Sequence, residues 1–319
     1  MDGMMKAVVL TGVTPADAVR LTEVPIPQVR PGWILVKVRA FGMNHSEQIL
    51  RLGEIQADYI QKPIIPGIEC VGEVADPSDS HFSIGQKVAA LMGGMGRSFD
   101  GSYAEYALLP THHVFSVESG LPWAELAVVP ETWFTAWGSL FDCLHLEKED
   151  TLLIRGSTCA LGYAAIQIAK ALGSRVIATT HRREKLALLH GADKAVLDTG
   201  TLEGQMPDVT KVLELVGPHT LLDSLRCVEP GGIVCNTGIL GGQFVLNGFD
   251  PIKDIPNGVY LTGFFSNYPT QATMDSIFSF IQNHSLSPEI GAVFDFAHIT
   301  EACRALDSGK VNGKIVVTV

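Results

Sequence analysis

The sequence predicts an α/β protein that combines a β-rich domain with a doubly wound parallel-sheet domain. Its 319 residues exceed what one ordinary hydrophobic core supports. Short apolar segments broken by Gly and Pro run from residue 5 to about 115, and from about residue 120 apolar segments alternate with helical patterns. We therefore expect one domain over residues 1–120, completed by residues 290–319, and a second domain over residues 121–289.

The first domain is predicted to be a small barrel-like unit, because its strands are short and interrupted by turn residues. Two late segments, GAVFDF (291–296) and KIVVTV (314–319), flank the helical pattern ITEACRALDSG (299–309), and we expect them to rejoin this domain. The other predicted strands are KAVVL (6–10), WILVKVRAFG (33–42), CVGEV (70–74), KVAALMG (87–93) and YAEYALL (103–109).

The second domain is predicted to contain a parallel sheet with helices on both faces, since strands and helices alternate along it. Inserted between the two parts of the first domain, it would leave an interdomain cleft, where substrates usually bind. Its predicted strands are TLLIRG (151–156), VIATT (176–180), KAVLD (194–198), KVLELVG (211–217), GIVCNTG (232–238) and VYLTGF (259–264).

Composition and charge exclude several classes of protein. A chain with 46% hydrophobic and 18% charged residues is typical of a globular protein. The net charge of −11 argues against a nucleic-acid partner. No apolar run approaches the ~20 residues of a membrane span, and the N-terminus lacks a signal-peptide core. The six cysteines are scattered without a CxxC pair, so we expect neither a disulfide ladder nor a zinc knuckle, and a cytoplasmic location.

Residues 151–180 contain the most informative pattern, a strand, a glycine-bearing turn from Gly156 to Gly162, an amphipathic helix and a second strand. A turn that opens a helix presents free N–H groups and the positive end of the helix dipole, which suit a pyrophosphate. We therefore predict a dinucleotide site. Cys159 and Ala160 stand where a glycine is usual, so the GxGxxG fingerprint is broken, and a plain strand–helix connection is the alternative.

The residues after the second strand indicate which dinucleotide binds. NAD sites usually place an Asp or Glu about 20 residues past the loop, where it accepts a hydrogen bond from the ribose 2′-hydroxyl. Here the strand ends at Thr180, and Arg182, Arg183 and Lys185 follow, with Glu184 as the first carboxylate. Hydroxyl and guanidinium donors suit a 2′-phosphate, so we predict NADPH. The alternative is an ordinary solvated helix start.

Two later strands are expected to supply the nicotinamide end of the site. Leu215-Val216-Gly217 and Thr237-Gly238-Ile239 each close an apolar run with a glycine. Ligands of open α/β sheets bind at the carboxyl edge of the strands, where both segments would lie. Each segment on its own could also be an ordinary strand-end turn.

Several motifs follow one another along nearly the whole chain. They are AFGMNHSE (40–47), PGIECVGEV (66–74), DGSYAEYALLP (100–110), PETWFTAWGSL (130–140), the cofactor unit, PGGIVCNTG (230–238) and GKIVV (313–317). By these motifs the chain resembles the medium-chain dehydrogenase/reductase superfamily, and within it the zinc-independent quinone-oxidoreductase-like branch. The resemblance implies a GroES-like catalytic domain, a Rossmann nucleotide-binding domain and NADPH between them.

The same comparison of motifs identifies family features that this chain lacks. Zinc-dependent relatives carry their ligands at positions that match Asn44, Ile68 and Glu131. One amide and one carboxylate cannot build a catalytic zinc site, which requires three protein ligands. The four-cysteine lobe that holds structural zinc is also missing, since residues 93–101 read GGMGRSFDG. Without a Lewis acid, reduction of an electron-poor substrate is favoured over alcohol oxidation.

Three residues are candidates for the chemistry. Asn44 matches the family's cleft asparagine, whose amide would donate to a substrate carbonyl or hold a water; alternatively it caps a turn before residues 45–52. Glu131, in an aromatic segment, is expected to have a raised pKa and to deliver a proton; alternatively it is a glutamate favoured by a helix N-terminus. Tyr59 lies farther along the chain than the tyrosines that the branch often places after the asparagine. Glu69 is expected to pair with a cation.

The resemblance extends the expected cofactor contacts beyond the glycine turn. Thr135 matches a nicotinamide-facing position, although a structural helix residue would be equally ordinary there. The expected contacts are Thr135, Gly156, Ser157, Thr158, Cys159, Ala160, Leu161, Gly162, Thr180, Arg182, Arg183, Lys185, Val216, Gly238, Ile239, Phe264 and Lys314.

The predicted function is reduction of quinones or α,β-unsaturated carbonyls by direct hydride transfer from NADPH, without zinc. One alternative is a 2-enoyl thioester reductase, which shares the superfamily and also lacks zinc. Another is a non-catalytic NADPH-binding protein. The expected partners are a small-molecule substrate and a second copy of the chain, through the strand near residues 258–264, as the family implies.

Overall fold

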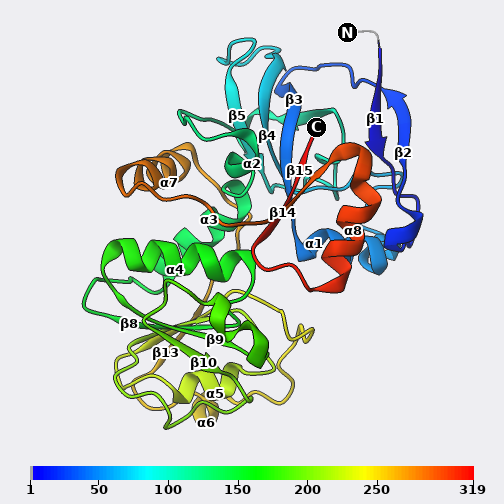
Figure 1. Ribbon diagram of the computed structural model, residues 1–319. Coiled ribbons are helices and arrows are strands. Elements are labelled where there is room, and N and C mark those ends of the chain that lie inside the picture. The colour runs from blue at the N-terminus through cyan, green and yellow to red at the C-terminus, as the bar shows by residue number, and fades with distance from the viewer. Residues whose placement is uncertain (1–2) are drawn as a thin grey trace. The chain divides into compact units, whose positions relative to one another are not determined.

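The fold contains a mixed sheet in one unit of the chain and a parallel sheet in the other, in a computed structural model that describes residues 3–319 (Figure 1). The first unit takes the residues up to Phe134 and Asn267–Val319, and the second takes Thr135–Ser266. This arrangement confirms the predicted α/β class, with a GroES-like and a Rossmann-like part. Within residues 3–319, no helix is both long and apolar enough to cross a bilayer.

The sheet of the first unit is built on the long strand β3, Trp33–Met43. Strand β15, Lys314–Thr318, pairs antiparallel with β3 and parallel with β14, Ile290–Asp295. The C-terminal strands therefore rejoin the N-terminal part of the chain, as the sequence predicts. The other strands are β1 (Met4–Val8), β2 (Leu21–Pro25), β4 (Glu69–Asp76), β5 (Lys87–Leu91), β6 (Tyr106–Pro110) and β7 (Val114–Ser116).

Helices flank this sheet and position its polar residues. Helix α1, His45–Leu52, starts directly after β3, and helix α8, Ile299–Ser308, connects β14 to β15. The buried face of α8 includes Ile299, Ala302 and Cys303, which join the same apolar core as the strand residues. The remaining helices are α2 (Trp123–Leu126), α3 (Pro130–Trp137), whose last three residues belong to the second unit, and α7 (Gln271–Asn283).

The second unit contains six parallel strands in the order β10-β9-β8-β11-β12-β13. The chain adds strands on one side of β8 up to β10 and then on the other side from β11 onward. The switch point of this Rossmann sheet therefore lies between β8 and β11. Figure 1 shows helix α4 on one side of the sheet and α5 on the other. The strands are β8 (Thr151–Arg155), β9 (Arg175–Thr180), β10 (Lys194–Leu197), β11 (Lys211–Glu214), β12 (Ile233–Asn236) and β13 (Tyr260–Gly263).

The helices of the second unit are fewer than the sequence pattern suggests. Helix α4, Ala160–Leu172, is long, but α5, Leu221–Arg226, and α6, Pro251–Asp254, are short. A 3₁₀ segment, Arg183–Leu188, replaces a helix after β9, and a π-helical turn, Gly138–Cys143, follows α3. Most of the helical cover on this sheet therefore comes from α4.

Candidate functional site

The glycine turn between β8 and α4 has the backbone geometry that close approach of a ligand requires. Gly156 has a φ of +85°, a left-handed conformation that favours glycine. A Cβ atom at Gly162 would overlap the carbonyl of Ser157, so glycine is also needed where α4 starts. The side chain of Ser157 is occupied within the fold, because its Oγ donates to Ile154 O (2.7 Å) and accepts from Thr179 N (3.0 Å).

The start of α4 is capped by an unusual residue. Cys159 is the N-cap, and its Sγ accepts a hydrogen bond from Gly162 N at 3.4 Å. A thiol is a weak acceptor, so the dipole at this end of the helix is only partly neutralised. The backbone N–H groups of the first helical turn, which includes Ala160 and Leu161, have no carbonyl one turn earlier in the helix. The turn therefore retains the features of an anion site although its fingerprint is broken.

The ends of β11 and β12 meet beside the glycine turn. The Glu214 carboxylate accepts hydrogen bonds from Val216 N (2.7 Å) and Gly217 N (3.0 Å), which fixes the turn after β11. A Cβ at Gly238 would overlap the carbonyl of Leu215, and a Cβ at Gly156 would lie 3.1 Å from Val216 Cγ2. The structure thus brings together three of the segments that were predicted as one cofactor site.

A polar contact connects the start of the second unit to β12. Ser139 Oγ donates to Thr135 O (2.7 Å) and lies 2.9 Å from Thr237 Oγ1, next to Gly238. The ring of Phe264 lies so close to Gly138 that a Cβ there would overlap it. Thr135 and Phe264 are therefore placed with the strand ends, as the family resemblance implied for the nicotinamide side.

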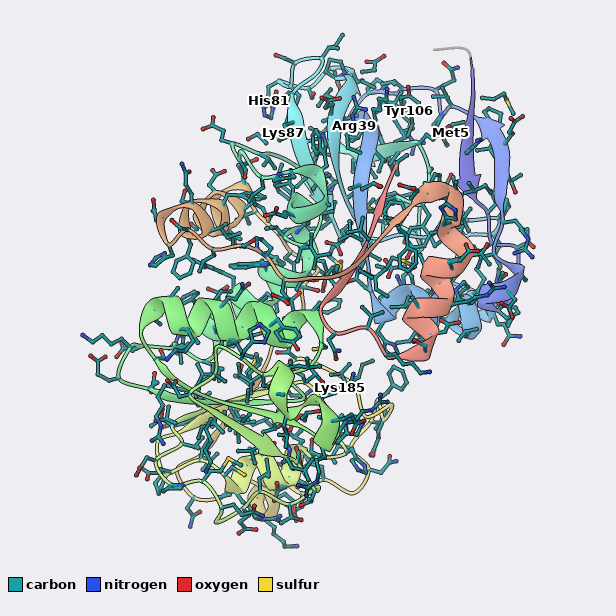
Figure 2. All side chains as sticks on the ribbon, in the orientation of Figure 1. Met5, Arg39, His81, Lys87, Tyr106 and Lys185 are labelled. Atoms are coloured by element: carbon teal, nitrogen blue, oxygen red, sulfur yellow. The ribbon has the colours of Figure 1, made fainter. Side chains whose placement is uncertain are left out.

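Basic residues follow β9, where the sequence predicted a 2′-phosphate site. Thr180 is buried, and its Oγ1 accepts from Arg182 N at 3.3 Å. Lys185 is half-buried in the segment after β9 (Figure 2), whereas Arg183 is exposed. The pKa of Lys185 is lowered by burial and by the nearby charge of Arg182. A bound anion would stabilise two cations that lie this close together.

A fully buried arginine, which the sequence analysis missed, supports the loops around this site. Arg155, at the end of β8, makes ion pairs with Asp198 (2.7 Å) and Asp223 (2.6 Å). Its guanidinium also donates to the carbonyls of Gly200 and Thr220. The only signal in the sequence was a charged residue at the end of an apolar strand. Arg155 therefore holds together the connections after three strands.

The first unit contains a second polar cluster, centred on Glu69 and Lys314. Both side chains are buried, with 0% and 1% exposure, and Lys314 Nζ lies 2.6 Å from Glu69 Oε1. The lysine also donates to Asn44 Oδ1 (2.6 Å) and Thr132 Oγ1 (2.8 Å). The predicted partner cation of Glu69 is thus Lys314. The sequence analysis expected Lys314 to contact the cofactor, but its ammonium contacts Glu69, Asn44 and Thr132 within the first unit.

The cluster fixes the orientation of Asn44, the candidate cleft residue. Asn44 Nδ2 donates to Glu69 Oε1 at 2.8 Å, while its Oδ1 accepts from Lys314. A flipped amide would point its oxygen at a carboxylate and its N–H groups at an ammonium, so the observed orientation is strongly preferred. Asn44 is also the N-cap residue of α1. One Nδ2–H remains beyond the bond to Glu69, and Asn44 is partly exposed.

The residues at the family's zinc positions are Asn44, Ile68 and Glu131, and both Asn44 Nδ2 and Glu131 N donate to the Glu69 carboxylate. Among residues 3–319, no group of three or more His, Cys, Asp or Glu side chains is arranged to hold a metal ion. The carboxylate that the Asn44 side chain contacts is Glu69, and it is already neutralised by the Lys314 ammonium, which would repel a divalent cation. A Cβ at Gly42 would overlap Lys314 Cε, so a glycine in β3 makes room for the lysine.

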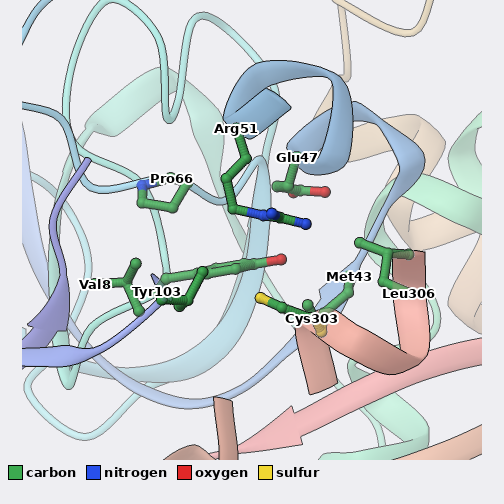
Figure 3. A pocket seen from close by; sticks show the side chains of 9 residues that line it. Val8, Met43, Glu47, Arg51, Pro66, Tyr103, Cys303 and Leu306 are labelled. Atoms are coloured by element: carbon green, nitrogen blue, oxygen red, sulfur yellow. The ribbon is translucent and has the colours of Figure 1, made fainter. Parts of the chain in front are cut away.

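A small cavity lies beside α1 in the first unit (Figure 3). Glu47 and Arg51 line it from α1, and the hydroxyl of the buried Tyr103 points into the same space without a partner in the structure. Burial raises the pKa of the Glu47 carboxyl to about 7, although Lys314 opposes the shift. Glu47 accepts from Asn44 N (2.7 Å) and Ile68 N (3.0 Å), so its carboxyl supports the backbone on either side of the cluster.

The other two candidates for catalysis have different surroundings. The Glu131 side chain is half-buried, and its backbone N–H donates to Glu69 Oε2 at 2.7 Å. Tyr59 is 69% exposed, and its hydroxyl donates to Glu54 Oε1 at 2.9 Å. That hydrogen bond raises the pKa of Tyr59, which makes it a weaker acid. Glu54 is paired in turn with Arg97, whose guanidinium also contacts Ser46 (2.9 Å).

Known proteins match this chain over most of its length. Residues 30–119 match the family described as the alcohol dehydrogenase GroES-like domain, and residues 160–283 match the zinc-binding dehydrogenase family. Acryloyl-coenzyme A reductase of Sulfurisphaera tokodaii is 24% identical, with 98% of this chain and 99% of that protein covered. The quinone oxidoreductase of Homo sapiens is 28% identical, with 93% and 92% covered.

Solved structures share the same fold. The structure of a mycobacterial protein complexed with NADPH has a TM-score of 0.84 and 23% identity, over 99% of this chain and 100% of that chain. A GroES-like part followed by a Rossmann-like part defines a class of nucleotide-dependent oxidoreductases. The chain belongs to the medium-chain dehydrogenase/reductase superfamily and is quinone-oxidoreductase-like, which confirms the resemblance found in the sequence.

Proposed function

We propose that the protein is an NADPH-dependent reductase of quinones or α,β-unsaturated carbonyls that works without zinc. The observation that carries the proposal is the cluster at Asn44. An amide held between Glu69 and Lys314 occupies a position where zinc-dependent relatives have a ligand. Such an amide can donate a hydrogen bond to a carbonyl oxygen that becomes negative during reduction.

The residues of the second unit suit a dinucleotide. When bound, NADPH would supply a hydride from C4 of its nicotinamide ring. The glycine turn and the start of α4 would hold the pyrophosphate, and the ends of β11 and β12 would line the nicotinamide side. Arg182 and Lys185 would bind the 2′-phosphate, which relieves the repulsion that lowers the pKa of Lys185.

The chain's own groups would then stabilise charge on the substrate. The free Nδ2–H of Asn44 would donate to the substrate oxygen, and Glu69 and Lys314 would keep the amide from rotating. We keep Glu131 as the proposed proton donor, because its backbone is anchored to Glu69 and its side chain is half-buried. Unchanged turnover of Glu131→Gln would remove it from the mechanism.

The role of Asn44 can be tested by truncation. Asn44→Ala should lower kcat by about 10²–10³-fold with a benzoquinone or a simple enone, a loss typical of an oxyanion donor. The Glu69–Lys314 pair remains in this variant, so the fold and the KM for NADPH should change little. Asn283→Ala, at an exposed position at the end of α7, is the matched control. Equal kcat in Asn44→Ala and wild type would contradict the proposal.

The cofactor preference has its own test. Arg182→Ala and Lys185→Ala should each raise the KM for NADPH by roughly 10–100-fold, the equivalent of one charge-assisted hydrogen bond, and leave the KM for NADH unchanged. Arg175→Ala is the matched control, because Arg175 is exposed at the opposite end of β9. A parallel loss with both cofactors would show that these residues support the fold and not the phosphate.

A 2-enoyl thioester reductase is the second candidate function. The similarity to acryloyl-coenzyme A reductase, which covers nearly the full length of both chains, favours it. Both functions use the same hydride transfer and differ in the substrate. Comparing kcat/KM for acryloyl-CoA with that for a free enone, under the same conditions, decides between them. NADPH binding without turnover of any of these acceptors would indicate the non-catalytic alternative.

We further propose that the protein is a cytoplasmic homodimer that associates through β13. This strand forms one edge of the described parallel sheet, and Tyr260 on it is 62% exposed. Val245 and Ile252 are exposed as well, at 62% and 88%. An exposed strand edge that carries an exposed aromatic side chain is a template for pairing with a second copy. Tyr260→Asp should shift the mass measured by light scattering from dimer to monomer.

A further inference from the structure

Two cysteines of the second unit lie side by side where a π-helical turn packs against the sheet. Cys143 ends the turn Gly138–Cys143, and Cys235 is in β12. The Cys143 thiol donates to Gly263 O at 3.6 Å, and Gly263 pairs with the residue that follows Cys235. Cys143 lies close enough to Cys235 to help raise the pKa of its thiol, after the larger effect of burial. This pair takes no part in the proposed reduction.

The two thiols differ in access to solvent. Cys143 is half-buried, while Cys235 is fully buried and contacts Thr237 Oγ1 at 3.3 Å. Burial raises the pKa of the Cys235 thiol to about 12, so Cys235 reacts poorly with an oxidant from solution, and the first oxidation is expected at Cys143. A partly exposed thiol beside a buried partner is the arrangement of an attacking and a resolving cysteine.

We propose that Cys143 and Cys235 form an oxidant-responsive site, in which a hydroperoxide converts the two thiols into a reversible disulfide. Cys143, as the thiolate, attacks an oxygen of the hydroperoxide; the O–O bond breaks, an alcohol or water leaves, and Cys143 becomes a sulfenic acid. The sulfur of Cys235 then attacks the Cys143 sulfur, the S–O bond breaks, and the proton of Cys235 leaves with the oxygen as water. Two thiols are oxidised, and one hydroperoxide is reduced to an alcohol and water.

The disulfide would join the 138–143 turn covalently to β12. Ser139 in this turn already contacts Thr237 Oγ1 at 2.9 Å, so the segments are held together before oxidation. Oxidation would therefore replace a set of hydrogen bonds by a covalent link across a long loop of sequence, which raises resistance to unfolding. This inference is independent of the proposed function, because none of its readouts uses NADPH or a substrate.

The test is a titration of the reduced full-length protein with hydrogen peroxide. Free thiols are alkylated afterwards, and the protein is digested without reductant for mass spectrometry. We expect a cross-linked peptide that contains Cys143 and Cys235, loss of two alkylatable thiols, and full reversal by dithiothreitol. The melting temperature should rise on oxidation and return on reduction. Cys227→Ala, which removes another buried thiol, should behave as wild type.

Two results with the wild-type protein would overturn the inference. One is oxidation of Cys143 to sulfinic acid while Cys235 stays alkylatable after unfolding. The other is a disulfide from Cys143 to a different cysteine or to a second chain. Cys143→Ser should lose the cross-link and the rise in melting temperature, and a variant that keeps both would also contradict it. The peptide map of the wild-type protein decides the question even if a variant folds poorly.

Discussion

Replacing Lys314 by methionine tests how the cluster around Asn44 is held together. The substitution keeps most of the volume of the side chain and removes its ammonium. Glu69 would then remain at 0% exposure, with hydrogen bonds from Asn44 and Glu131 but no cation. Removal of one member of a buried ion pair typically costs about 3–5 kcal/mol, because the other charge stays buried and uncompensated.

Differential scanning calorimetry measures this loss. At about 2.1 cal/mol/K of unfolding entropy per residue, 1 kcal/mol corresponds to a shift in Tm of about 1.5 °C for 319 residues, so Lys314→Met should melt roughly 4–8 °C below the wild type. The double variant Glu69→Gln/Lys314→Met should recover much of that loss, since the glutamine oxygen can still accept from Glu131 N–H. The recovery isolates the coupling between the two side chains.

A small effect would refute the reasoning. If Lys314→Met melts within about 2 °C of the wild type, the pair contributes no more than an exposed ion pair would. If the double variant is as unstable as the two single losses added together, the side chains act independently. Arg39→Met is the matched control, because Arg39 pairs with Glu73 at 2.6 Å but both side chains are about one-third exposed. Its Tm should change by no more than a few degrees.

Three further predictions concern other buried groups. The folded-state pKa of Glu47 is raised from 4.5 to about 7. The free energy of unfolding should therefore fall by roughly 3 kcal/mol as the pH rises from 4.5 to 7. Urea titrations at both pH values should show this fall in the wild type and a flat response in Glu47→Gln. Arg155→Met should leave Asp198 and Asp223 without their cation and lower the midpoint of urea unfolding by the equivalent of about 3–5 kcal/mol, whereas a midpoint close to that of the wild type would contradict the network. Gly42→Ala should displace Lys314 and lower both Tm and kcat, and a variant that matches the wild type in both would show that the lysine has room to move.

Most strands and their order along the chain could be predicted from the sequence, because each is a short apolar run bounded by turn residues; β2 (Leu21–Pro25) and β7 (Val114–Ser116) were missed. The return of residues 314–318 to the first unit was predicted as well and is confirmed by their pairing with β3. The helices of the second unit were harder to predict. The sequence pattern suggested strand–helix alternation throughout, but the chain between Leu197 and Lys211 contains only turns. Periodicity identifies a long helix such as α4 and says little about such connections.

The candidate site could be predicted in part. Local motifs indicated that Gly156 and Gly162 are needed for a tight turn and close packing, and the structure shows this backbone geometry, while their contacts to a cofactor stay a prediction. The sequence also indicated that Glu69 needs a cation. It could not identify Lys314 as that cation, because the two residues are far apart in the chain and meet only when β15 pairs with β3. The same holds for Arg155, whose acidic partners lie 43 and 68 positions later.

The most direct test of the central proposal is oxidation of NADPH and NADH by chelator-treated protein, side by side, with 1,4-benzoquinone and a simple enone. We expect turnover that prefers NADPH, is unchanged by removal of metal ions and gains nothing from added zinc. Activity that disappears with the chelator and returns with zinc would contradict it, since the cluster of Asn44, Glu69 and Lys314 would then not replace a metal.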